Sequence, residues 1–421
     1  MDELDKIFSR ALAPKIFVNR EVLRPDYIPE QLPHREEQIK SLGMIVSVAL
    51  QGERPSNLFI YGLTGTGKTA VVKYVLKRLS DKSLEFNRPV KWFYINTRID
   101  NTSYRVFTRI GELSGLKLPF TGLSTAEVYK RVRDFLDSEK RIYIVVLDEL
   151  DFLARNESDE VLYKLARINE DLTKAKVGII GITNNIRFVE NLDARVRSSL
   201  GEEEMVFPPY NAIQLEDILR ERAKLAFKEN SVSEEAIKIC AALAAREHGD
   251  ARRALDLLRI AGEIAEREQA EKVLEEHVYK AYDELEKERV IQLVSTLPFH
   301  SRIVLLSLLK MESEGVNVTT GELYIVYREI SQKLGIDPVT QRRVSDIISE
   351  LEALGILSAR VVNRGRYGKT RILKITVNPS TLIEIFIQDP LIRDYVEREL
   401  ENLLSTETQE SSDIQIKIFK T

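Results

Sequence analysis

The sequence contains little cysteine, histidine or tryptophan and no long hydrophobic run. Its single cysteine, Cys240, cannot form a disulfide within the chain, so a reducing compartment is expected. The four histidines do not have the spacing of a zinc site. The longest apolar runs, such as residues 142–147, fall well short of the ~20 residues that a membrane-spanning helix needs. We therefore expect a cytoplasmic protein with no membrane partner.

Neither sign of charge dominates the chain as a whole. Its 421 residues include 62 Lys and Arg against 66 Asp and Glu, which gives a net charge of −4. The 43% of hydrophobic residues and 30% of charged residues exclude a wholly disordered protein, and the length suggests roughly three domains. Nucleic-acid binding would therefore depend on local clusters of basic residues.

Short apolar segments alternate with amphipathic segments over the first half of the chain. Strands that are apolar throughout and separated by helices predict a parallel sheet that is buried on both faces. The predicted strands are 58–61, 90–95, 142–147 and 177–182, and the predicted helices are 68–79, 125–136 and 160–174.

The pattern changes after Pro209. Residues 211–290 show helical periodicity without a convincing strand, and Ser233 is expected to cap one of these helices. Residues 290–378 begin with helices and end in two strand-like runs around a basic turn, which is the outline of a winged helix. The stretch 394–413 carries seven acids and one base, which predicts a solvated helix leading into an acidic tail.

The segment 62–69 fits the phosphate-binding pattern G-x-x-x-x-G-K-[ST] and joins a predicted strand to a predicted helix. Its glycines let backbone N–H groups face phosphate oxygens, while the helix N-terminus favours negative charge. We expect Lys68 to contact the β- and γ-phosphates and Thr69 to ligate Mg²⁺. The predicted nucleotide-binding residues of this segment are Gly62, Thr64, Gly65, Thr66, Gly67, Lys68 and Thr69.

An alternative interpretation is a dinucleotide-binding fingerprint, G-x-G-x-x-A, which begins at Gly65. That motif expects an acidic residue at the end of the second strand, but the predicted strand 90–95 ends in Asn96-Thr97. It would also have no use for Lys68-Thr69. We therefore favour the nucleoside triphosphate site.

Polar residues follow two later strands. Asp148 ends the predicted strand 142–147, where it can hold Mg²⁺ through water, and Glu149 can polarise an attacking water. Asn184 follows the strand 177–182 and could orient water or the γ-phosphate. Because they follow a P-loop in the same predicted sheet, these residues complete a candidate ATPase site.

Together these motifs resemble those of the AAA+ ATPases, and further strings resemble the archaeal origin-recognition and helicase-loader initiators over roughly residues 15–378. The order of these strings along the chain carries most of the specificity. The strings are Tyr27–Glu36, Pro119–Ser124, Leu192–Leu200, Phe207–Tyr210, Gly249–Leu255 and Gly365–Arg371.

The resemblance implies an α/β AAA+ sheet with a helical lid and an α+β winged-helix domain. It divides the chain into a base at 1–208, a lid at 209–288, a winged helix at 289–395 and an acidic tail at 396–421. It also implies ATP or ADP and Mg²⁺ as cofactors. Arg252 would touch the γ-phosphate, and Tyr210 and Arg222 would line the nucleotide. Arg195 and Arg197 are followed by Ser-Ser where some relatives have Ser-Arg, so an arginine finger and rapid hydrolysis are not expected.

Basic residues gather near the end of the winged helix. Residues 358–377 contain six bases and no acid, which suits a hairpin that contacts phosphates or a minor groove. The helix 340–354 should bury Val344, Ile347, Ile348, Leu351 and Leu354 and present its polar side to the major groove. The predicted DNA-binding residues are Gln341, Arg342, Arg343, Ser345, Arg364, Arg366, Tyr367, Lys369 and Arg371. In the resembled family an insertion also touches DNA, for which Arg98, Arg105 and Arg109 are candidates.

The resulting hypothesis is a nucleoid-associated, ATP-dependent replication initiator that binds origin duplex DNA and helps recruit the replicative helicase, with initiator paralogues as further candidate partners. Hydrolysis would be slow and would act as a switch. One alternative is a P-loop regulator that uses its winged helix in transcription, and another is a clamp or helicase loader indifferent to DNA sequence.

Overall fold

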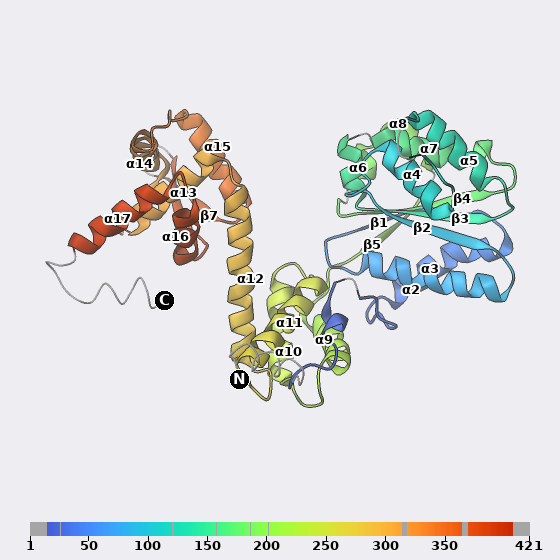
Figure 1. Ribbon diagram of the computed structural model, residues 1–421, viewed down its shortest axis with the longest axis horizontal. Coiled ribbons are helices and arrows are strands. Elements are labelled where there is room, and N and C mark those ends of the chain that lie inside the picture. The colour runs from blue at the N-terminus through green and yellow to red at the C-terminus, as the bar shows by residue number, and fades with distance from the viewer. Residues whose placement is uncertain are drawn as a thin grey trace. The chain divides into compact units, whose positions relative to one another are not determined.

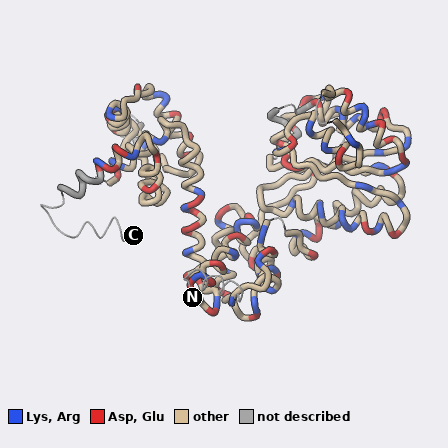
Figure 2. Tube along the Cα trace, viewed as in Figure 1, with Lys and Arg blue, Asp and Glu red and all other residues tan. Residues whose placement is uncertain are grey.

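The computed structural model describes residues 15–25, 27–119, 122–156, 158–185, 187–200, 202–313, 318–363 and 369–406. The chain divides by its internal contacts into two compact units, residues 1–281 and 282–421. In Figure 1 the first unit runs from blue to yellow and the second from yellow to red. Helix α12 (Glu275–Thr296) runs through both this division and the predicted boundary between residues 288 and 289. Along this helix, Lys and Arg are interspersed among more numerous Asp and Glu (Figure 2).

A five-stranded parallel sheet forms the centre of the first unit, in the order β2-β3-β4-β1-β5. The inner strand β3 is buried at all seven positions, as the apolar pattern predicted. The edge strand β5 was not predicted, because three successive glutamates do not resemble a buried strand, although charge is tolerated at a sheet edge. The strands are β1 (Asn57–Gly62), β2 (Val90–Asn96), β3 (Ile142–Asp148), β4 (Lys176–Thr183) and β5 (Glu202–Phe207).

Helices cover both faces of this sheet (Figure 1). Apolar residues of α2 (Glu36–Ser47) and α3 (Lys68–Glu85) form one core with the sheet. The core on the opposite face includes residues from the helices α4 (Ser103–Ser114), α5 (Thr125–Leu136), α6 (Leu150–Asn156), α7 (Ser158–Asp171) and α8 (Ala194–Leu200). Single 3₁₀ turns lie at Arg20–Leu23, Val48–Gln51 and Val189–Asn191. Together these layers confirm the predicted AAA+ P-loop sheet.

Three helices follow the sheet and form the lid, as predicted. They are α9 (Ala212–Ala226), α10 (Glu234–Arg246), which Ser233 caps, and α11 (Ala251–Arg267). Residues 15–35, here called the N-terminal strap, pack against this lid before the chain enters α2. Phe17 stacks on Phe227 with ring centroids 4.6 Å apart, and Ile16 and Leu23 are completely buried. The strap therefore belongs to the lid core although it precedes the whole sheet in sequence.

The second unit has the predicted winged-helix fold. Helices α13 (Phe299–Ser313), α14 (Thr320–Lys333) and α15 (Gln341–Ala353) precede the antiparallel pair β7 (Leu357–Asn363) and β8 (Lys369–Ile375), and the short strand β6 (Val318–Thr319) joins β8. Four of the five apolar residues predicted in α15 are buried. The prediction for Leu354 was wrong: it follows the last residue of the helix and is 38% exposed.

Two further helices, α16 (Pro379–Gln388) and α17 (Arg393–Thr406), complete this unit. Val396 of α17 is buried, and Glu399 pairs with Lys310 across 2.7 Å. The predicted solvated helix is therefore packed against the winged helix over its first turns. None of the described helices combines the length and apolarity that a bilayer crossing requires.

Candidate nucleotide and DNA sites

The P-loop is the tight turn that joins β1 to α3. Gly65 and Gly67 have φ values of +73° and +89°, in the left-handed region that glycine adopts without strain. Lys68 begins α3, and its Nζ donates hydrogen bonds of 2.8 Å to Gly62 O, Leu63 O and Asn184 Oδ1. The predicted lysine and the predicted asparagine thus lie in direct contact, although 116 positions separate them in the sequence.

Burial of the Lys68 ammonium lowers its pKa to about 8, because removal from water disfavours the charged form. The carboxylate of Asp148 opposes this shift and the guanidinium of Arg252 adds to it. An anion at this position would favour the charged ammonium. The lowered pKa therefore reflects an ammonium that burial has removed from water.

The predicted magnesium-binding residues converge at the end of β3. Thr69 Oγ1 and Tyr94 Oη donate hydrogen bonds of 2.7 and 2.8 Å to Asp148 Oδ2, and Asp148 is only 6% exposed. Burial, followed by the charge of Asp148, raises the pKa of Tyr94, which keeps its hydroxyl protonated as a donor. A hydroxyl and a carboxylate oxygen within 3 Å suit Mg²⁺, which prefers hard oxygen ligands and retains several waters.

Glu149 follows Asp148 in a strained conformation, with φ of +57°. The amide of Asn96 donates to its Oε1 across 3.3 Å, and Arg98 Nη1 lies 3.9 Å from its Oε2. Asn96 ends the neighbouring strand β2, so the parallel register brings these two strand ends together. The carboxylate is thus held beside the Asp148 site by a side chain that sequence analysis did not assign to it.

A cavity of about 1000 Å³ contains these groups, a volume at the upper end of the range for small-molecule pockets. The predicted catalytic residues Glu149, Asn184 and Arg252 all line it, and Arg252 is exposed to it from the start of α11. Gly62 lies outside the lining and contributes its carbonyl to Lys68. The other predicted nucleotide-binding and metal-binding residues that line the cavity are Thr64, Gly65, Thr66, Gly67, Lys68, Thr69, Asp148, Tyr210 and Arg222.

Arg35 is the principal residue of this site that sequence analysis missed. It is 2% exposed and donates to Thr66 O at 2.9 Å, to Pro208 O at 2.7 Å and to His34 O at 3.0 Å. Its guanidinium carbon also lies 3.8 Å from the centroid of the Tyr210 ring. Arg35 therefore ties the P-loop to the start of the lid and covers one face of Tyr210. Its place in the family-like string at 27–36 was the one available signal.

Arg222 is also more enclosed than a simple phosphate contact requires. Its Nη1 donates to Val22 O across 2.8 Å, and its guanidinium lies 4.7 Å from the centroid of the Tyr27 ring. Burial lowers its pKa. Arg222 thus holds the strap against α9 while it lines the cavity.

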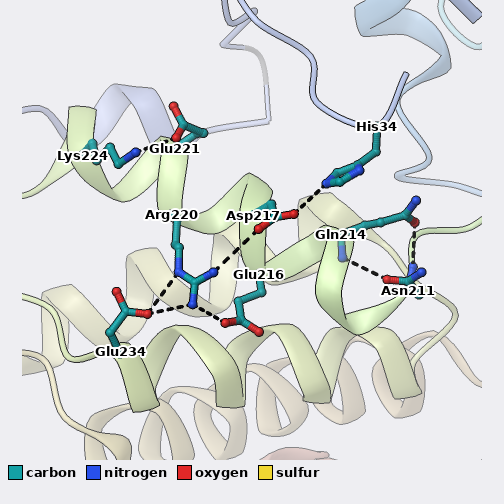
Figure 3. A network of polar contacts seen from close by, with 9 residues as sticks. All are labelled: His34, Asn211, Gln214, Glu216, Asp217, Arg220, Glu221, Lys224 and Glu234. Carbon is teal, nitrogen blue, oxygen red and sulfur yellow. Dashed lines mark hydrogen bonds and ion pairs between the residues drawn. The ribbon is translucent and has the colours of Figure 1, made fainter. Parts of the chain in front are cut away.

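A polar network joins the strap to the lid beside this contact (Figure 3). His34 Nε2 lies 2.9 Å from Asp217 Oδ2, and Arg220 lies between Asp217, Glu216 and Glu234. The network connects the strap with α9 and the start of α10. Strap residues 24, 25 and 27–33 also line the cavity, so the strap forms one of its walls.

The predicted DNA-binding residues of α15 lie on its outer side. Gln341, Arg342 and Arg343 are exposed, and Ser345 is partly exposed and donates to Gln341 O across 3.1 Å. Arg343 pairs with Glu350 of the same helix across 3.0 Å, so an acid shares this surface.

The hairpin also contacts the outer side of α15. Arg371 on β8 donates from its Nη1 to Ser349 Oγ of α15 across 3.0 Å, which connects the hairpin with the helix. Arg364, Arg366 and Tyr367 lie outside the described residues, as does the side chain of Lys369, whose backbone begins β8. In the first unit, Arg105 donates to Ile99 O and Arg109 pairs with Glu112.

Three family models match successive parts of the chain. A model of the AAA domain matches residues 51–188, one of the Cdc6 AAA+ ATPase-type lid domain matches 216–283, and one of the CDC6 C-terminal winged helix domain matches 292–385. The chain is also 56% identical over 382 residues to ORC1-type DNA replication protein 1 of Sulfurisphaera tokodaii, covering 90% of this chain and 95% of that protein. The chain belongs to the ORC1-type DNA replication protein family. Its first unit accordingly carries an AAA+ ATPase domain.

Solved structures agree with this membership. The structure of the Aeropyrum pernix ORC1 protein in complex with DNA is 51% identical and superposes with a TM-score of 0.76, covering 90% of this chain and 99% of that one. Cdc6p from Pyrobaculum aerophilum, at 24% identity and a TM-score of 0.57, covers 91% of this chain and 100% of its own and shares the fold.

Proposed function

We propose that this chain is an ATP-dependent DNA replication initiator, which binds origin duplex DNA through its winged helix and uses nucleotide as a switch. One observation carries the proposal. A single polypeptide contains a P-loop cavity with its carboxylates in place and a winged helix with exposed basic residues on α15. The ORC1 protein of A. pernix, which is 51% identical, is described in complex with DNA.

We assign the following roles to the predicted residues of the cavity. The P-loop N–H groups and Lys68 bind the phosphates, while Tyr210 and Arg222 line the nucleotide and Arg252 approaches the γ-phosphate. Thr69 and Asp148 hold Mg²⁺, which neutralises charge on the phosphates when it is bound. Glu149 polarises the attacking water, and Asn184 orients Lys68 and the γ-phosphate.

Slow hydrolysis is part of the proposed switch. The Glu149 carboxylate accepts a hydrogen bond from Asn96 and lies near Arg98, so these contacts compete with its action as a base and slow it. Arg195 lies 3.7 Å from Asp193, and the serines after Arg197 depart from the pattern of some relatives. We therefore propose hydrolysis that resets the protein after each round of binding.

In the winged helix, we propose that Gln341, Arg342, Arg343 and Ser345 meet the major groove while the hairpin contacts the adjacent phosphates or minor groove. The contact between Arg371 and Ser349 would keep the helix and the hairpin in one orientation. Binding to origin DNA implies a cytoplasmic, nucleoid-associated protein. The replicative helicase and initiator paralogues are the proposed protein partners.

The test compares the wild type, Lys68→Ala and the matched control Lys82→Ala for binding of ATP and of origin and random duplexes. Lys82 lies on the same helix but pairs with Glu85 at the surface, outside the cavity. We expect Lys68→Ala to lose ATP binding and the nucleotide effect on DNA affinity, and Lys82→Ala to keep both. The initiator proposal fails if the wild type prefers no sequence over random duplex across a range of salt concentrations.

A further inference from the structure

The lid touches the P-loop directly at the turn between α10 and α11. This turn contains two successive residues with positive φ, His248 at +85° and Gly249 at +68°. A β-carbon at Gly249 would lie 2.2 Å from Tyr210 O, so the turn is packed tightly against the residue that opens the lid. Such a sharp, crowded turn fixes the direction in which the next residue, Asp250, points.

Asp250 performs two functions at the start of α11. Its Oδ1 accepts hydrogen bonds from the N–H groups of Arg252 at 2.7 Å and Arg253 at 3.3 Å, which makes it the N-cap of the helix. The same carboxylate lies against the P-loop, since a β-carbon at Gly65 would come within 1.6 Å of Asp250 Oδ1. The next backbone N–H, that of Ala251, donates to Gly65 O across 3.2 Å.

Gly65 therefore meets two separate demands. Its φ of +73° suits the curl of the P-loop, and its missing side chain also leaves the space that the Asp250 carboxylate occupies. The pattern G-x-x-x-x-G-K-[ST] requires glycine at positions 62 and 67 but accepts any residue at position 65. The contact with the lid supplies a physical reason for glycine there that phosphate binding alone does not.

We propose that Gly65 and Asp250 form a latch between the P-loop and the lid, and that Asp250 is a positioning residue for Arg252. The inference rests on the proposed binding of ATP in this cavity. By capping α11 while it lies against Gly65, Asp250 fixes where the first turn of the helix starts, and Arg252 belongs to that turn. Without the latch, the first turn of α11, and Arg252 with it, would no longer be held at the P-loop.

The first experiment measures the latch without nucleotide, by hydrogen exchange of the full-length protein at the Ala251 amide. We expect this amide to be protected in the wild type and to exchange at least about tenfold faster in Asp250→Ala, because its acceptor Gly65 O moves away. The matched control is Ser233→Ala, which removes the N-cap of α10 in the same lid and does not line the cavity. An unprotected Ala251 amide in the wild type, or equal exchange in the two variants, overturns the latch.

The second experiment uses a double-mutant cycle on the dissociation constants for ATP and ADP. Asp250→Ala should weaken ATP binding about tenfold more than Ser233→Ala does, and should weaken ADP binding less, as Arg252→Ala also should. Gly65→Ala should weaken ATP binding, and adding Asp250→Ala to it should restore at least about threefold, because the collision with the carboxylate is gone.

The outcomes separate the latch from the proposed function. If the wild type binds no ATP, the proposed function fails while the exchange result on the free protein still decides the latch. If the wild type binds ATP but Asp250→Ala weakens ATP and ADP equally, the positioning role of Asp250 is refuted. A cycle in which the losses of Gly65→Ala and Asp250→Ala simply add also refutes the contact.

Discussion

The buried ammonium of Lys68 leads us to expect that ATP affinity falls as the pH rises through 8. Its pKa is lowered from 10.5 to about 8 in the nucleotide-free protein, chiefly because burial removes water from the charge. Phosphate oxygens beside the ammonium would favour its charged form and raise the pKa again. Binding of ATP is therefore coupled to uptake of a proton by Lys68 whenever the pH approaches or exceeds 8.

The size of the effect follows from the two protonation states. With a pKa of about 8, about ten of eleven free molecules carry the charge at pH 7 and about one of eleven at pH 9. If the complex needs the charged form, ATP affinity falls about tenfold over this range, or about 1.4 kcal/mol. A lysine with an unshifted pKa of 10.5 would change the affinity by less than about 10% over the same range.

The same shift has a defined sign for stability without nucleotide. The unfolded chain binds the Lys68 proton more tightly than the folded protein does, so this group makes the free energy of unfolding rise with pH between about 8 and 10.5. ATP affinity and the stability of the free protein should thus change in opposite directions over this range. This opposition distinguishes titration of Lys68 from a general loss of structure at high pH.

The assay is isothermal titration calorimetry of ATP at pH 7, 8 and 9 in buffers of different ionisation enthalpy. We expect uptake of about half a proton at pH 8 and about a tenth at pH 7, the fraction of uncharged lysine at each pH. The matched control is Lys73→Arg, because Lys73 also lines the cavity and its pKa is also lowered, chiefly by burial. Constant affinity from pH 7 to 9, or loss of the pH dependence in Lys73→Arg, would refute the assignment to Lys68.

Four further substitutions test single residues. Glu149→Gln should retain bound ATP and stop its hydrolysis in a single-turnover assay, and unchanged turnover would remove the role of Glu149 as base. Arg35→Ala should lower the free energy of unfolding by about 2–4 kcal/mol in a urea titration, because a buried guanidinium that donates to three carbonyls is lost; a loss under about 0.5 kcal/mol would contradict this. Arg342→Ala should weaken origin DNA binding by about 1–3 kcal/mol, and an equal loss on random duplex would identify a phosphate contact instead of a base contact. Arg343→Ala should weaken DNA binding less in the same assay, because the guanidinium of Arg343 already pairs with Glu350.

Features set by local sequence were predictable. Helix α5 has the predicted bounds of Thr125 and Leu136, because a serine cap precedes it and its apolar residues recur at helical spacing. The P-loop was predictable because glycines, lysine and threonine have a fixed order between a strand and a helix. The contact of Lys68 with Asn184 followed from topology, since adjacent parallel strands end at one edge of the sheet.

Features set by position in the fold were not predictable in this way. The three glutamates at the start of β5 did not indicate a strand, because the prediction looked for apolar runs. An edge strand such as β5 needs fewer apolar residues than a central one. Conversely, Leu354 has the spacing of a core residue but lies where α15 has already ended, so its side chain stays exposed. In both cases the apolar spacing led to the wrong expectation, because the position of the segment relative to the neighbouring elements decided the outcome.

Two residues of the nucleotide site that sequence analysis missed, Arg35 and Asp250, have backbone groups as hydrogen-bond partners. Arg35 donates to three carbonyl oxygens, and Asp250 accepts from the N–H groups at the start of α11. Arg222 was predicted, but its hydrogen bond to the carbonyl of Val22 was not. Every residue offers a backbone carbonyl, so such a contact requires no particular side chain in the partner segment and produces no paired motif. Asp148 and Thr69, in contrast, bond through side chains and were both predicted. Residues that belong to a motif are thus predictable from the sequence, whereas side-chain pairs such as Tyr94 with Asp148, and the contacts that join strap, P-loop and lid into one cavity, become visible only once the chain has folded.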